Sequence, residues 1–110
     1  MSGRTFKVVT FVPPEHLDAL ADALRKIRIN RLGNYQNCMS WTQVTSSWDS
    51  LGEAHPFLGT PGKRSIESEC RLEFQCDESR LGEAVATIRE RHPYEEPEID
   101  IYPLLDPDAL

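Results

Sequence analysis

The most regular part of the chain is residues 66–76, where apolar and polar side chains alternate. One set of alternate positions is largely apolar, and its members are Ile66, Cys70, Leu72, Phe74 and Cys76. The other set is polar, and its members are Glu67, Glu69, Arg71, Glu73 and Gln75. Successive side chains of a strand point to opposite faces, so this run predicts a strand with one side in the core and the other in water. The chain must then build a sheet covered on one face only. The carboxylates of the wet side are expected to face solvent, where a row of like charges could also gather cations.

Local patterns on both sides of this strand predict the remaining elements. Residues 5–12 carry β-branched and aromatic side chains on both faces, which is typical of an interior strand, and two prolines end it. Apolar residues recur at helical spacing over residues 15–27. They recur again after Asp77, which is placed to cap a second helix that ends near His92, before Pro93. Residues 38–45 and 99–104 are predicted strands, and residues 46–64 are a long loop containing glycine and proline.

The predicted order is therefore βαββαβ, which consists of two βαβ halves. Such an order is typical of the α+β class and folds as a ferredoxin-like sandwich, a four-stranded antiparallel sheet with two helices on one face. At 110 residues the chain is expected to be a single domain, 1–110, with its long loop at 46–64. Apolar residues of the first strand lie on the uncovered sheet face, which favours a homo-oligomer over a monomer.

The charge balance argues against several partners. A formal net charge of −6 disfavours nucleic acid, because that affinity comes mostly from Lys and Arg. No apolar stretch approaches the roughly 20 residues of a membrane span, and no apolar signal region precedes the first strand, so we expect a cytoplasmic protein with no membrane partner. The three cysteines are expected to stay reduced, since Cys70 and Cys76 lie too far apart along one strand to form a bridge.

The segment His-Pro-Tyr-Glu-Glu-Pro at residues 92–97 concentrates groups with possible chemistry. Ligand types for a divalent metal gather in and just after it: His92, Glu95, Glu96 and Asp100, with Cys38 or His55 able to complete a shell. The structural alternative is a corner in which the imidazole ends a helix, the prolines stiffen the turn, Tyr94 packs and the glutamates are solvated. The spacing is not a recognised metal signature, so both interpretations stay open.

Cys38 and the aromatic residues around the long loop also admit two roles each. Cys38 would be a nucleophile if His92 or His55 lowered its pKa, but a lone strand cysteine is more often a small core residue. Trp41, Trp48 and Phe57 bracket the loop, either as an aromatic binding lip or as anchors to a neighbouring subunit. The glycine-containing motifs of acyl hydrolases, dinucleotide-binding proteins and P-loop proteins do not occur in the sequence.

Six blocks, in order over almost the entire chain, carry a resemblance to a known family. They are residues 11–20, 32–38 (Leu-Gly-Asn-Tyr-x-x-Cys), 56–59 (Pro-Phe-Leu-Gly), 71–73, 92–97 and 100–104. These blocks resemble the insertion domain of the NGG1-interacting-factor family, a domain that also looks like a free-standing, YqfO-like protein in many bacteria. Residues 28–31 and 48–53 depart from the family pattern, which puts in doubt any ligand contact that relatives make there.

The resemblance implies a fold similar to CutA and to PII signalling proteins, whose ferredoxin-like subunits commonly assemble as trimers through their sheets. It therefore implies self-association, with a trimer favoured over a dimer. In the large family members the two-metal site lies in the surrounding domains, so no enzyme activity is carried over to this chain.

We therefore expect a non-enzymatic, oligomeric binding or regulatory module of the CutA/PII-like type, with no catalytic residue assigned. The candidate ligand is a divalent metal or a small molecule, bound at a cleft between subunits that is lined by Tyr35, Cys38, His92 and Glu95. Candidate ligand-binding residues are Asn34, Tyr35, Cys38 and Tyr94, and candidate metal ligands are His92, Glu95 and Glu96. Two alternatives belong to other classes: a small metal- or cysteine-dependent enzyme using Cys38 and His92, and a structural domain that recruits another protein.

Overall fold

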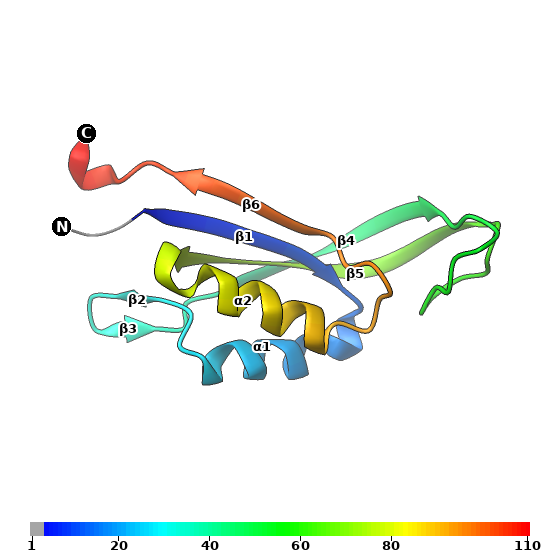
Figure 1. Ribbon diagram of the computed structural model, residues 1–110, viewed down its shortest axis with the longest axis horizontal. Helices are drawn as coiled ribbons and strands as arrows, with labels where there is room; N and C mark the ends of the chain where they lie inside the picture. Colours follow the sequence, from blue (N-terminus) through cyan, green and yellow to red (C-terminus); the bar gives the residue numbers. More distant parts are fainter. Residues whose placement is uncertain (1–3) are drawn as a thin grey trace.

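The computed structural model describes residues 4–110, so residues 1–3, on which the localisation prediction partly depends, lie outside the described part. One sheet forms one layer and two helices form the other (Figure 1). The main elements are β1 (Thr5–Val12), α1 (Leu17–Lys26), β4 (Ser40–Asp49), β5 (Arg64–Asp77), α2 (Glu78–Arg91) and β6 (Ile99–Leu104). Short elements are η1 (Pro14–His16), β2 (Arg31–Leu32), β3 (Tyr35–Gln36) and η2 (Pro107–Ala109).

The strand order is β4-β5-β1-β6, and every neighbouring pair is antiparallel. With both helices on one face of this sheet, the predicted ferredoxin-like fold is confirmed (Figure 1). The bounds of β1 and β6 agree with the predicted strands. No helix among residues 4–110 is long and apolar enough to cross a membrane.

The core lies between the helices and the sheet. Its largest fully buried side chains include Phe74, Leu20, Leu24, Ile29, Leu72, Ile88, Val8 and Val12. Each such side chain contributes roughly 1.5–3 kcal/mol relative to leaving it exposed. The helical spacing of α1 and the alternation of β5 therefore meet in one apolar layer.

The face pattern predicted for β5 is correct from Cys70 onward and wrong before it. Ile66, expected in the core, is 68% exposed, whereas Glu69, expected in solvent, is only 3% exposed. The physical reason is that β1 pairs with β5 only as far as Cys70, so residues 64–69 pair with β4 alone and extend past the main body. There the covered side is the one that carries Glu69.

The strand β4 is longer than predicted, and the loop after it is correspondingly shorter. Its pairing with β5 continues from Ser46 opposite Glu67 to Asp49 opposite Arg64, so the connecting loop comprises residues 50–63 rather than 46–64. An ion pair between Asp49 and Arg64, with Oδ1 and Nε 2.7 Å apart, lies at the end of this ladder. The Thr and Ser residues of 45–47, which look like loop in isolation, are held as strand by their partners on β5.

A small hairpin of β2 and β3, which the sequence did not lead us to predict, follows α1 at the opposite end of the sheet from the 50–63 loop (Figure 1). Gly33 takes a φ of 60° in its turn, a conformation that favours glycine. The side chain of Asn30 holds the hairpin to the sheet: its Nδ2 donates to the carbonyls of Cys38 (2.9 Å) and Gln75 (2.7 Å), and its Oδ1 accepts from the Cys38 amide (2.8 Å).

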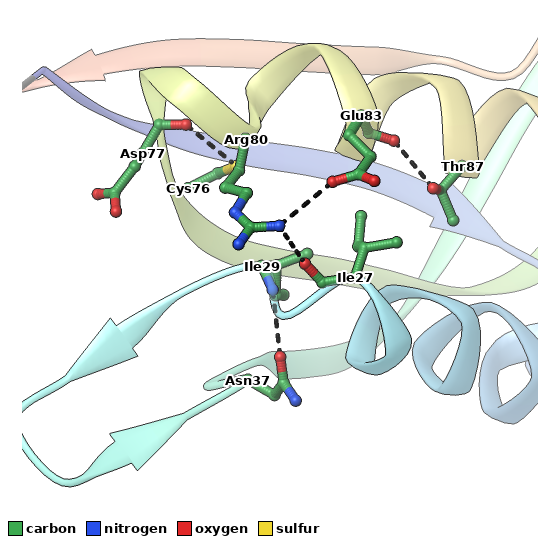
Figure 2. Close-up of polar contacts among 8 residues, drawn as sticks. All are labelled: Ile27, Ile29, Asn37, Cys76, Asp77, Arg80, Glu83 and Thr87. Carbon is green, nitrogen blue, oxygen red and sulfur yellow. Dashed lines mark hydrogen bonds and ion pairs between the residues drawn. The ribbon is translucent and has the colours of Figure 1, made fainter.

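The start of α2 is held differently from the prediction. Asp77 occupies the N-cap position, but its side chain makes no capping hydrogen bond, so the predicted carboxylate cap is wrong. Arg80 of α2 instead donates to the carbonyl of Ile27 at the end of α1 (3.0 Å) and lies 3.4 Å from Glu83 (Figure 2). The two helices are thus joined by a charged side chain at a helix end, where a cation complements the dipole.

Candidate functional site

The corner after α2 is built around the imidazole of His92. This residue is 7% exposed, and its Nε2 lies 2.6 Å from the carbonyl oxygen of Phe11. Its Nδ1 accepts the backbone N–H of Tyr94 at 3.1 Å. A carbonyl can only accept and an amide can only donate, so these partners require a neutral ring with its proton on Nε2. Burial lowers the pKa of His92, although its bond to the Phe11 carbonyl and the charge of Glu69 act to raise the pKa.

Tyr94, placed by this corner, contacts the buried carboxylate on β5. Its hydroxyl donates to Oε2 of Glu69 at 2.5 Å. Burial raises the pKa of Tyr94 strongly, and the hydrogen bond to Glu69 and that residue's charge raise it further. The phenol therefore keeps its proton, and it serves as a donor rather than as a base.

The 50–63 loop folds back onto the same corner. The backbone N–H of His55 donates to Oε1 of Glu95 at 3.0 Å. The ring of Phe57 lies edge-on to the ring of His16, with centroids 5.1 Å apart, and 6.3 Å from the ring of Tyr94. Trp48 approaches Tyr94 from β4, with centroids 5.8 Å apart. Three aromatic rings thus converge from a strand, a loop and a corner.

A pocket of about 790 Å³ lies where these segments meet. This volume falls within the usual range for small-molecule sites, roughly 300–1,000 Å³. Its apolar and aromatic lining is Phe11, Trp48, Leu51, Ala54, Pro56, Phe57, Leu58 and Tyr94. Its acidic lining is Asp49, Glu53, Glu69, Glu95, Glu96 and Glu98. Among the lining residues, all drawn from the described part of the chain, none is a Lys, Arg or His.

The acidic residues differ in their surroundings. Glu69 is buried beside Tyr94, whereas Glu53, Glu95, Glu96 and Glu98 are exposed around the opening. A hydrogen bond to Asp100 raises the pKa of Glu98, and burial and the charges of Asp100 and Glu69 raise it as well. The pocket therefore has an acidic side chain in its wall and several more at its rim.

Only some of the predicted site residues lie at this pocket. Tyr94, Glu95 and Glu96 line it, and His92 lies behind it. Asn34, Tyr35 and Cys38 instead lie at the end of the sheet that carries the β2–β3 hairpin (Figure 1). This separation follows from the predicted order of elements, because the connection after α1 and the connection after α2 lie at opposite ends of a ferredoxin-like sheet.

Cys38 and His92 do not form a pair within one chain. The side chain of Asn30 bonds both Cys38 and Gln75, and Gln75 pairs with Lys7 on β1. His92 is bonded to Phe11, which lies four residues further along β1. Four residues of a strand span roughly 13 Å, so Cys38 and His92 are near opposite ends of this strand. The predicted metal set is not assembled either, because both ring nitrogens of His92 are engaged and residues 4–110 contain no cluster of three or more potential ligands.

Sequence reasoning missed Glu69 and Glu98 as pocket residues. No local signal marks Glu69, because its burial depends on where β1 stops pairing with β5 and on Tyr94, 25 residues further along the chain. Trp48 and Phe57, predicted as an aromatic lip or as subunit anchors, both line the pocket, while Trp41 lies outside it.

Two of the three thiols lie in the core. All three cysteines are free, and Cys70 and Cys76 are buried. Burial raises the pKa of Cys76 to about 11, with a further contribution from Asp77 and an opposing one from Arg80. Burial also raises the pKa of Cys70. Both therefore remain protonated thiols in the core.

Comparison with known proteins finds relatives over most of this chain, although no family model matches it. It is 33% identical over 99 residues to the GTP cyclohydrolase 1 type 2 homolog of Halalkalibacterium halodurans, a match that covers 90% of this chain and 27% of that protein. It is 30% identical over 95 residues to the protein of the same name from Staphylococcus aureus strain COL, covering 86% of this chain and 26% of that protein. The chain thus spans about a quarter of the length of these curated relatives.

One solved structure agrees with this relation, and two others share the fold alone. A Bacillus cereus protein related to NIF3 superposes with a TM-score of 0.80 at 26% identity, covering 96% of this chain and 27% of that one. CutA1 from Oryza sativa gives a TM-score of 0.69 at 20% identity, over 96% of this chain and 84% of that one. GlnK from B. subtilis, solved as a complex with ATP, gives 0.66 at 15% identity, over 94% of this chain and 84% of that one.

Proposed function

We propose that this chain, which is related to one segment of the NIF3-type GTP cyclohydrolase 1 type 2 homologues and has a CutA/PII-like fold, is a non-enzymatic module that binds a small ligand. The observation that carries the proposal is the pocket of about 790 Å³ with the rings of Trp48, Phe57 and Tyr94 in its wall. A mostly apolar hollow with a few fixed polar groups is the usual form of a small-molecule site.

The polar groups around the pocket favour binding over catalysis. Both nitrogens of His92 are used by the backbone, and the phenol of Tyr94 holds its proton against Glu69. Cys38, the nucleophile of the alternative enzyme hypothesis, lies at the other end of the sheet. These groups act as supports for the pocket wall, which is what a binding site requires and an acid–base site does not.

The ATP complex of B. subtilis GlnK supports the same class of function. It shows that a protein of this fold binds a small molecule, although at 15% identity the likeness to GlnK is one of fold alone. In this chain the backbone of His55, in the 50–63 loop, is bonded to Glu95 beside the pocket. A ligand that changed this bond would also move the loop, and such a change would give the module a regulatory role.

Self-association through the open face of the sheet is part of the proposal, with a trimer favoured over a dimer. What supports it is the uncovered face itself. Both helices lie on the same face of the sheet, and on the opposite face the side chain of Arg71 is 42% exposed, so this face is available to a second copy.

A fragment screen tests the ligand proposal, and the two tryptophans provide a matched pair of variants. Trp48 lines the pocket, whereas Trp41, on the same strand and 47% exposed, does not. Binding is measured by saturation-transfer NMR. We expect small apolar fragment compounds to bind the wild type and the Trp41→Leu variant equally well, and to bind the Trp48→Leu variant much more weakly. Equal binding to both variants, or no binding to the wild type, would contradict the proposal.

Native mass spectrometry tests self-association. The wild type is expected to appear as a trimer, and Arg71→Glu to shift toward monomer, because the substitution places a carboxylate beside Glu73, which already lies 3.4 Å from Arg71. The control is Arg31→Glu, a charge reversal on the β2–β3 hairpin. A monomeric wild type at micromolar concentration would rule out this part of the proposal.

A further inference from the structure

Resting on the proposed function, we infer that the ligand of this pocket is an organic cation, a small molecule with an apolar body and an ammonium head. The arrangement of acidic and aromatic side chains in the pocket carries this inference.

The charge of the lining is of one sign. Of its six acidic residues, Asp49 is paired with Arg64 through a 2.7 Å contact, which leaves five glutamates. The lining, taken from residues 4–110, supplies no basic side chain to offset them. A ligand that carries phosphates would meet like charge on every side, whereas a cation would meet complementary charge. The nucleotide bound by GlnK is therefore a poor guide to the ligand here.

Glu69 is buried, so negative charge lies in the wall of the pocket as well as at its rim. Glu69 is 3% exposed and takes part in none of the ion pairs among the described residues. Its one side-chain hydrogen bond comes from Tyr94, a neutral donor. Charges inside a partly closed pocket are screened less than surface charges, so this carboxylate attracts a cation more strongly than the exposed glutamates do.

The aromatic rings suit the same ligand. The planes of Trp48 and Phe57 are inclined to that of Tyr94 by 54° and 44°, so the three rings form a cup rather than a parallel stack. Aromatic faces attract cations through their quadrupole, and rings set at angles are the usual way proteins surround an alkylammonium head. An inorganic ion is less well matched, because the described residues contain no cluster of three metal ligands.

The test compares three probes on one reporter. Choline carries the ammonium charge, 3,3-dimethylbutan-1-ol has nearly the same shape without it, and ATP is the anionic alternative. The Trp41→Phe variant leaves Trp48 as the sole tryptophan, so its fluorescence reports on the pocket. We expect choline to bind about tenfold more tightly than the neutral alcohol, with the preference reduced at high salt, and ATP not to bind.

A pair of charge variants makes the test specific. Glu95→Gln/Glu96→Gln removes two rim charges, keeps an acceptor for the His55 amide, and should weaken choline binding about threefold or more while leaving the neutral alcohol unaffected. Glu90→Gln, on α2 and outside the pocket, is the control and should change neither.

The failures are distinguishable. Equal binding of choline and the alcohol, or tighter binding of ATP than of choline, would overturn the ligand class and leave the proposed binding function standing. The ligand class is overturned in the same way if other fragments bind and choline does not. Absence of any fragment binding would overturn both the ligand class and the binding function.

Discussion

Replacing Tyr94 by Phe removes a single hydroxyl from the pocket wall while keeping the ring that packs against Trp48 and Phe57. That hydroxyl is the side-chain hydrogen-bond donor to Glu69, and Glu69 is 3% exposed. A hydrogen bond to a charged group is worth about 1.5–3 kcal/mol, and its loss leaves a buried carboxylate under-satisfied. We therefore expect the free energy of unfolding to fall by about 2 kcal/mol and Tm to fall by about 8 °C.

The measurement is urea unfolding followed by circular dichroism at pH 7 and at one protein concentration, since self-association would otherwise shift the apparent stability. Tyr35→Phe is the control: this tyrosine, on the β2–β3 hairpin, is 75% exposed, so its hydroxyl is free to bond water and the change should cost less than about 0.5 kcal/mol. In a Glu69→Gln background the loss caused by Tyr94→Phe should shrink to about 1 kcal/mol, because the remaining bond is between neutral groups. A loss below about 0.5 kcal/mol in the wild-type background would refute the role assigned to this bond.

Three further predictions concern other supports of the fold. Burial lowers the pKa of His92 in the folded state, so the unfolded chain binds the proton more readily than the folded chain does. The contribution of His92 to stability is therefore full above about pH 6.5, the ordinary pKa of histidine. It is lost as the pH falls toward the pKa of the folded state. Urea unfolding between pH 5 and 7.5 checks this expectation, and a His92→Gln variant should show a smaller slope over that window. Asn30→Ala removes three hydrogen bonds made by a buried side chain and should lower the free energy of unfolding by about 2–4 kcal/mol, whereas a loss under about 1 kcal/mol would show that water replaces them. Gly59→Ala should cost more than about 1 kcal/mol in thermal unfolding, because its φ is 90° and its new Cβ would meet the Ser65 hydroxyl, while Gly52→Ala, which has open space around it, should be nearly neutral.

Much of the fold was predictable because its signals are local. Alternation over 66–76 and helical spacing over 15–27 depend on neighbours in the sequence, and the order of the elements then selects one topology. The burial of Glu69 was not predictable from its strand, because it depends on where β1 stops pairing and on Tyr94, 25 residues further along the chain. The segment 92–97 contains prolines and acidic residues, and from these it was predicted to be either a structural corner or a ligand site. The structure shows a corner that also forms one wall of a pocket.

Within one chain, Asn34, Tyr35 and Cys38 do not lie beside His92. The sequence shows which residue types can bind a ligand, but the end of the sheet from which each loop emerges decides which of them meet. Following the direction of each strand through the predicted order would have placed the 50–63 loop, rather than the turn at Gly33, beside His92 (Figure 1).

The unequal length of β5 and β1 has a mechanical consequence. Residues 64–69 continue past the last pair with β1 for roughly 20 Å, and β4 is their only strand partner, so this part of the hairpin is a two-stranded ribbon. Ribbons of two strands twist and bend more readily than wider sheets. Bending of this arm near Cys70 would move the 50–63 loop, and with it the ring of Phe57, relative to Tyr94 on the corner.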